Sequence, residues 1–168
     1  MNYLIRLAMF LAAATAVTVY ADDRCNALLL GADIERMAWN NDQVIHVKDR
    51  NSNLLGSILY RTDPIRPGWL SLDSIQVDGA YRGIGVSKLL FSVMLKHVPD
   101  VTRIESALMG DNLKAAVLGE DTRNVDEELC KRMVMKTPAY KVRASNGFTR
   151  ITQCEYYIWG ILLTVSTP

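Results

Sequence analysis

The feature that most constrains the fold is a glycine-rich junction between an expected strand and an expected helix. Residues 69–77 alternate apolar and polar side chains, which is typical of a strand. From Val86 to Val98 the apolar residues recur at a spacing of three or four, which predicts a helix. Gly83 and Gly85 lie between them, and glycine adopts backbone angles that other residues avoid. Because the first N–H groups of a helix have no partner inside it, this turn predicts an anion site suited to phosphate.

The turn matches neither of two familiar phosphate loops. It lacks the Gly-Lys-Ser/Thr ending of a Walker loop and the Gly-x-Gly-x-x-Gly spacing of a dinucleotide fingerprint. The pattern Val-x-x-x-Tyr-Arg-Gly-x-Gly-x-Ser-x-Leu-Leu, which starts at Val77, instead resembles the pyrophosphate loop of the GNAT superfamily of acyl-CoA-dependent N-acyltransferases. Members carry Arg/Gln-x-x-Gly-x-Gly/Ala there, and Arg82, Gly85 and Ser87 fill those places. Ser87 departs from the pattern but is still small. The alternative is a glycine-tolerant turn that binds nothing.

This resemblance implies an α/β fold: a mixed, mostly antiparallel twisted sheet flanked by helices, with a parallel β-α-β core that binds acyl-CoA. In such a fold the main chain of the loop holds the pyrophosphate, and the end of the preceding strand pairs with the pantetheine amides. One N–H group of that strand would also polarise the thioester. The residues expected to bind acetyl-CoA or another acyl-CoA are Ile75, Gln76, Val77, Arg82, Gly83, Ile84, Gly85, Val86, Ser87, Asn112 and Arg143. Asn112 opens an Asn-x-x-Ala that resembles the family's; capping its own helix is the alternative role.

The remaining elements follow from apolar spacing and from turn residues. We expect a loose helix at 22–39, strands at 43–48, 54–60 and 103–109, a helix beginning at 111, an insertion at about 117–138 that is broken at Pro138, a helix at 139–145 capped by Gly147, and closing strands at 148–152 and 156–165. The family carries a Gly-Phe soon after Asn-x-x-Ala, whereas Gly147-Phe148 comes 35 positions after Asn112 (147 minus 112). The segment between them is therefore interpreted as an insertion.

Acyl transfer from a thioester to an amine also needs a base for the amine. Asp73 lies in the strand before the loop, and strand carboxylates near this place serve as bases in some family members. A carboxyl group buried among apolar neighbours has a raised pKa, which suits a base. The alternative is an exposed strand acid, and Glu105 on the next strand is the second candidate.

The leaving thiolate also needs stabilisation, and here the resemblance is incomplete. Many members carry a tyrosine four residues before the Gly-Phe glycine, where this chain has Arg143. An arginine cannot donate a proton at neutral pH, but its charge can stabilise a thiolate. Tyr140 lies three residues earlier and is near enough on a helix to replace the missing tyrosine. A packed aromatic without a catalytic role is the alternative for Tyr140.

The N-terminus resembles a targeting segment. Residues 7–19 are apolar, Val19-Tyr20-Ala21 fits a signal-peptidase site, and the apolar run is short for a membrane span. We therefore expect a signal peptide at 1–21 and one acyltransferase-like domain at 22–168, which gives a mature chain of 147 residues (168 minus 21). An uncleaved anchor is the alternative. Without Arg6 the mature chain has 18 basic and 18 acidic residues, which argues against nucleic acid or an anionic membrane as a partner.

The cysteines bear on compartment and on metal chemistry. Cys25, Cys130 and Cys154 predict one disulfide and one free thiol in an oxidising compartment, with the pairing left open. No Cys-x-x-Cys or His/Cys cluster is present, so no structural metal is expected.

Three functions remain open from the sequence alone. The first is a secreted or periplasmic N-acyltransferase that acts on a primary amine of a small molecule or a protein lysine; delivery into a host cell would bring it to acyl-CoA. The second is a secreted GNAT-fold binding module that has lost catalysis. The third is a small disulfide-bonded α/β domain that acts on a partner surface.

Overall fold

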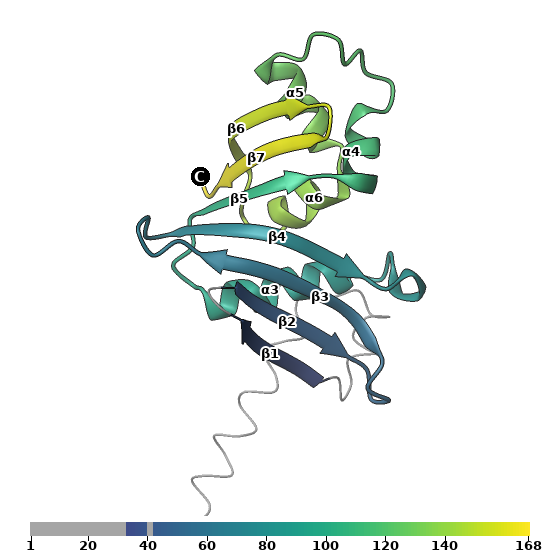
Figure 1. Ribbon diagram of the computed structural model, residues 1–168, viewed down its shortest axis with the longest axis vertical. Coiled ribbons are helices and arrows are strands. Elements are labelled where there is room, and N and C mark those ends of the chain that lie inside the picture. The colour runs from purple at the N-terminus through teal and green to yellow at the C-terminus, as the bar shows by residue number, and fades with distance from the viewer. Residues whose placement is uncertain (1–32, 40–41) are drawn as a thin grey trace, which may run out of the picture.

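The computed structural model describes residues 33–39 and 42–168. The strands are β1 (Asp33–Trp39), β2 (Asp42–Lys48), β3 (Leu54–Thr62), β4 (Trp69–Val77), β5 (Arg103–Leu108), β6 (Arg150–Tyr157) and β7 (Gly160–Ser166). The helices are η1 (Gly79–Tyr81), α3 (Val86–His97), α4 (Gly110–Val117), α5 (Glu127–Met135) and α6 (Pro138–Ala144). Within these residues the strands form one 7-stranded sheet in the order β1-β2-β3-β4-β5-β7-β6 (Figure 1).

The sheet is antiparallel at every described pairing except β4 with β5, which run parallel. Helix α3 follows β4 and precedes β5, so β4-α3-β5 is the crossover unit that parallel strands require. A mixed, mostly antiparallel sheet with one β-α-β unit and a helical insertion confirms the predicted fold class.

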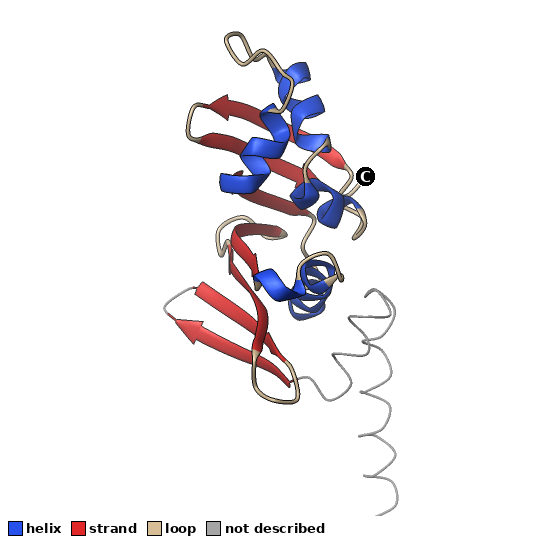
Figure 2. Cartoon of the chain, turned by 90° about the vertical axis from the view of Figure 1, so that its right-hand side faces the viewer, coloured by secondary structure: helices blue, strands red, loops and turns tan. Residues whose placement is uncertain are grey.

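Helix α3 covers one face of the first strands, as Figure 2 shows. Its apolar face is buried because those side chains pack on β2, β3 and β4; the buried members are Val86, Leu89, Leu90, Phe91, Val93 and Met94. Phe91 also meets Phe148 edge to face, with 6.1 Å between ring centroids. Since Phe148 lies in the loop between α6 and β6, this pair joins α3 to the C-terminal half of the molecule.

A disulfide anchors the inserted helix. Cys130 on α5 bonds Cys154 on β6, with 5.8 Å between the Cα atoms, and both residues are buried. The sequence had left the pairing open, and Cys25 lies outside the described residues. The bond fixes α5 against the edge strand of the sheet, so the insertion is part of the packed domain.

The predicted helix at 22–39 is wrong where it can be compared with the structure. Residues 33–39 form β1, which pairs antiparallel with β2 from Asp33↔Lys48 to Trp39↔Asp42. The spacing was loose, and long-range pairing with a neighbouring strand outweighed a weak local helical preference. The rest of that segment lies outside the described residues, as does the expected signal peptide at 1–21.

Two further boundaries differ from expectation. Pro138 begins α6 instead of breaking a helix, because proline is tolerated in the first turn, where no N–H donor is needed. The Thr137 hydroxyl accepts a hydrogen bond from the Tyr140 N–H and caps the same helix. The closing hairpin turns at residues 158–159, so β6 runs on through the polar positions 153–155, where we expected the break. Helix α6 ends before Gly147 (φ 92°), as predicted.

The other predicted elements are confirmed: the strands at 43–48, 54–60 and 103–109, the hairpin between the first two, and the helices beginning at 86 and at about 111. Among the described helices, none combines the length and the apolar character needed to cross a bilayer.

Candidate functional site

The glycine turn leads into α3, and no side chain caps the start of that helix within the described residues. Asp78 caps the start of η1, because its carboxylate accepts a hydrogen bond from the Ala80 N–H at 2.9 Å. The chain then passes through Gly83 (φ 82°) and Gly85 (φ 95°), both in the left-handed region that favours glycine. Gly85 is the N-cap residue of α3, and it offers no side chain to the first helical amides.

Several backbone donors at this turn are unused. The hydrogen-bond ladder of α3 begins with the Leu89 N–H, which donates to the Gly85 carbonyl at 3.1 Å. Within the described residues, no acceptor is found for the N–H groups of Val86, Ser87 and Lys88. A Cβ atom placed on Gly83 would meet no described atom within 4 Å, so space is open on that side. Unpaired amides beside open space at a helix N-terminus form a place where an anion can bind.

Arg82 adds positive charge to the same turn. Its side chain is mostly exposed and lies 3.7 Å from an Asp111 carboxylate oxygen at the start of α4. Its Nε also donates a long hydrogen bond, 3.5 Å, to the Val77 carbonyl. Exposed pairs of this kind contribute little to stability, so Arg82 can exchange this partner for a phosphate. The loop residues named from the sequence therefore lie together.

Strands β4 and β5 separate beside the turn. They pair only from Trp69↔Arg103 to Leu72↔Ser106, although β4 continues to Val77 (Figure 1). We call the point after the Leu72↔Ser106 pair the fork. The register of β3 with β4 shifts at the same place, because Leu59 faces Ser74 and Tyr60 faces Leu72. Asp73 is thus the extra residue of a β-bulge, which bends a strand and accounts for the separation.

Past the fork, β4 has a sheet partner on one side only. Ile75, Gln76 and Val77 pair with β3, and among the described residues they have no partner strand on the side toward β5. The backbone groups on that side are therefore open to an extended ligand, which would add to the sheet as a strand does. This is the place where the resemblance predicted binding of the pantetheine amides.

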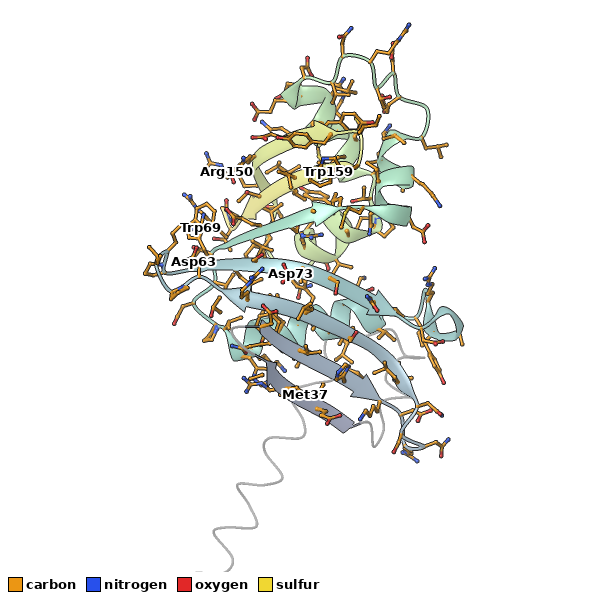
Figure 3. The ribbon with its side chains drawn as sticks, in the orientation of Figure 1. Met37, Asp63, Trp69, Asp73, Arg150 and Trp159 are labelled. Carbon is orange, nitrogen blue, oxygen red and sulfur yellow. A yellow bond between two sulfur atoms is a disulfide. The ribbon has the colours of Figure 1, made fainter. Side chains whose placement is uncertain are left out.

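The two candidate bases lie on the face of the sheet away from α6. Asp73, labelled in Figure 3, is exposed. Its carboxylate lies 3.5 Å from Arg61 Nη2 and accepts a hydrogen bond from the Ser71 hydroxyl at 3.2 Å. The exposed-acid alternative for Asp73 is thus the one found, and the expected burial is not. Glu105 accepts a bidentate pair from Arg66 at 3.0 and 3.1 Å, so its charge is already matched.

Arg143 lies on the opposite face, at the fork. Its side chain comes from α6 and the residue is 3% exposed. Its Nη2 donates to the Ser106 hydroxyl at 2.7 Å, while Nε and Nη1 have no hydrogen-bond partner among the described residues. Desolvation by burial lowers the pKa of Arg143 to about 10, so the guanidinium stays protonated at neutral pH. The sequence had indicated the position of Arg143 but not its burial.

The other two named side chains have internal partners. The Tyr140 hydroxyl donates a hydrogen bond to the Thr149 carbonyl at 2.9 Å, so its proton is already used inside the protein. The Asn112 side-chain oxygen accepts the Ala139 N–H at 3.1 Å, so Asn112 caps α6 instead of its own helix. Both side chains therefore help to position the helix that carries Arg143.

Sequence reasoning missed two parts of this site. Ser106 was not named, although a serine between Ile104 and Leu108 on the buried side of a strand was a usable signal. The bulge at Asp73 had no signal in the sequence, because it arises from the register between β3 and β4. Within the described residues, no group of three or more His, Cys, Asp or Glu residues could hold a metal ion.

No protein-family model matches the chain. No curated protein matches it either. Similar solved structures include a protein assigned to the GNAT acetyltransferase family from Desulfovibrio desulfuricans, with a TM-score of 0.49 and 11% identity over 74% of this chain and 68% of that one. The NatC complex bound to a Gag peptide and CoA gives 0.49 and 17% over 74% and 70%. Mutant forms of the spermidine/spermine N-acetyltransferase SpeG from Vibrio cholerae give 0.48 and 14% over 75% and 66%. Because these TM-scores and sequence identities are low, a function can be inferred only from the residues of this chain.

Proposed function

We propose that this protein belongs to the GNAT superfamily and transfers an acyl group from acyl-CoA to a primary amine. The observation that carries the proposal is the set of unpaired amides at the start of α3, which lie at the end of β4 where it has separated from β5. A diphosphate would bind those amides and Arg82. The pantetheine arm would then run along the open side of Ile75, Gln76 and Val77 toward the fork.

The reaction proposed is a single displacement on the thioester carbon. The neutral amine nitrogen forms the new C–N bond, the C–S bond breaks, and the sulfur leaves with the electron pair as a thiolate. The proton lost by the nitrogen passes to Asp73 or to water. Arg143 stabilises the thiolate by charge, since it cannot supply a proton at neutral pH. In this scheme the amine arrives on the face of Asp73 and the coenzyme on the face of Arg143.

The loop assignment is tested by isothermal titration of the full chain with CoA. Gly85→Trp places an indole among the amides that would bind the diphosphate, so we expect no measurable CoA affinity with an unchanged circular dichroism spectrum. Gly119→Trp is the matched control, because Gly119 also has a positive φ (79°) but lies in the insertion. Wild-type affinity in the Gly85→Trp variant would refute the loop assignment.

A binding module without catalysis is the second candidate. Three observations favour it: Asp73 is exposed and ion-paired, the Tyr140 hydroxyl is bonded within the fold, and Arg143 stands where an acid would be. Release of free CoA from acetyl-CoA, and from longer and acidic acyl-CoA donors, is measured with a panel of small amines and lysine peptides. Tight binding of CoA with no release above the uncatalysed rate would establish the module.

We further propose that the protein is exported, with residues 1–21 as its signal peptide. The Cys130–Cys154 disulfide supports this, because such bonds persist mainly in oxidising compartments. Since acyl-CoA is a cytosolic metabolite, an exported enzyme would need delivery into a host cell to meet its donor. Fractionation of the producing cells with N-terminal sequencing tests the export. A chain that keeps Met1 and remains in the cytosol would contradict it.

A further inference from the structure

Arg143 has more donor capacity than its surroundings use. A guanidinium carries five N–H donors. In the described structure only the Nη2 bond to Ser106 is made, and no carboxylate of a described residue lies within ion-pair distance of Arg143. A buried charge without a partner is strongly unfavourable, which indicates that Arg143 binds a ligand that is absent from the free protein.

The location of the guanidinium indicates which part of a bound coenzyme it would contact. Ser106 is the last β5 residue paired with β4, so its partner Arg143 lies at the fork on the helix-covered face. The proposed diphosphate site lies at the other end of the free stretch of β4. From Val77 back to Leu72 the strand covers about 16 Å at roughly 3.3 Å per residue. A coenzyme bound along it would direct its sulfur end, and the acyl chain beyond the sulfur, toward Arg143.

The unused donors indicate an anionic ligand that is present before the reaction. A thiolate forms only as the product leaves, and the carbonyl oxygen of a neutral acetyl group could accept a hydrogen bond but would leave the charge of the guanidinium unmatched. A carboxylate has two oxygens that match the planar arrangement of guanidinium donors. It would also neutralise the charge in the bound state.

We propose that Arg143 binds a carboxylate on the acyl chain, so that the preferred donor is a dicarboxylic acyl-CoA, such as a succinyl thioester, rather than acetyl-CoA. This inference rests on the proposed function and names the acyl class of the same site. The displacement itself is unchanged: the C–N bond forms, the C–S bond breaks, and the distal carboxylate takes no part in bond making. Arg143 is here a specificity residue: with a dicarboxylic donor its charge is matched by the distal carboxylate and no longer serves the leaving thiolate.

The test compares two four-carbon donors that differ in the distal carboxylate. Succinyl-CoA and butyryl-CoA are titrated into the full chain at neutral pH, with CoA as reference, and CoA release is followed with each donor. We expect the wild type to bind succinyl-CoA about tenfold more tightly, or better, because of charge-assisted hydrogen bonds. Arg143→Met removes this preference and keeps the affinity for butyryl-CoA. Arg143→Lys keeps part of the preference, since a point charge replaces the planar donors.

Lys141→Met is the matched control on α6, because Lys141 is exposed, and the preference is expected to be unchanged. Equal affinity of the wild type for succinyl-CoA and butyryl-CoA, with CoA still bound, overturns this inference and leaves the proposed function standing. A preference for succinyl-CoA that persists in Arg143→Met overturns the role of Arg143. Failure of all three compounds to bind overturns both proposals.

Discussion

Two residues flank the fork with opposite charge and on opposite faces. Ser71 pairs with Glu105 and Leu72 with Ser106, so alternate residues of β4 and β5 face alternate sides. Asp73 hydrogen-bonds Ser71 on one side, and Arg143 hydrogen-bonds Ser106 on the other. In the proposed reaction, the separation of the strands is the place where the amine from one face meets the thioester from the other.

Replacing the buried guanidinium tests whether its burial destabilises the folded protein. We expect Arg143→Met to raise the free energy of unfolding by about 1 to 3 kcal/mol at neutral pH, because an unpaired buried charge is removed, although Ser106 loses its donor. Because burial lowers the folded-state pKa of Arg143 to about 10, the unfolded chain binds this proton more tightly. The destabilisation is therefore complete below pH 10 and declines as the pH rises further.

The measurement is urea unfolding of wild type and variant at several pH values. The difference between the two proteins should shrink above about pH 10, where the buried guanidinium begins to lose its proton. Lys141→Met should change the free energy of unfolding by less than about 0.5 kcal/mol. A variant less stable than the wild type at neutral pH would mean that Arg143 has a partner in the free protein.

The catalytic role proposed for Asp73 can be separated from its ion pair by experiment. Asp42 and Asp73 both lie near Arg61, at 3.4 and 3.5 Å, but only Asp73 is the bulge residue at the fork. We expect Asp73→Asn to lower kcat by about a hundredfold or more, because the amine loses its base. Asp42→Asn should leave kcat nearly unchanged. Equal small effects in steady-state kinetics would assign both carboxylates to surface electrostatics.

At the level of elements, α6 brings Arg143 to the fork, and the neighbouring helices hold α6 and the insertion in place. Helix α5 is bonded to β6 by the disulfide, and Asn112 on α4 caps α6, which carries Arg143. The family pattern expects one helix between Asn-x-x-Ala and Gly-Phe. Here α4, α5 and α6 take its place, and they present arginine where many members present tyrosine.

Loss of the disulfide should lower the stability of the fold without abolishing CoA binding. The two cysteines are 24 residues apart, and closing a loop of that size corresponds to roughly 3 kcal/mol of chain entropy in the unfolded state. We expect the double variant Cys130→Ser/Cys154→Ser to lose about that much in urea unfolding while CoA affinity stays within a fewfold. Cys25→Ser is the control that leaves the bond intact. A stability loss near zero would show that the bond does not restrain the chain.

At the scale of the whole molecule, the parallel pairing of β4 with β5 is short. It extends over Trp69↔Arg103 to Leu72↔Ser106, and packing such as Phe91 against Phe148 joins the two halves in addition. A coenzyme seated along β4 would contact the start of α3 and the fork together. Binding should therefore stabilise the whole chain, by about 2.7 kcal/mol at a hundred times Kd.

Hydrogen exchange locates that effect. In the free protein we expect fast exchange at Val86, Ser87 and Lys88 and slow exchange from Leu89 onward, because the helix bonds begin there. Saturating CoA should slow the first three amides markedly and also slow amides in residues 75–77. Amides of β6, far along the sheet, serve as the internal reference. Slow exchange at Val86–Lys88 before CoA is added would contradict the open site.

The sequence by itself determined the features that depend on neighbouring residues. Alternation predicted β4, apolar spacing predicted α3, and two glycines predicted the turn between them, so the fold class and the glycine turn were predictable. The tertiary structure alone decided the strand at 33–39, the pairing of Cys130 with Cys154, the bulge at Asp73 and the burial of Arg143. Each of these depends on contacts between residues distant in the chain, and local periodicity carries no information about such contacts.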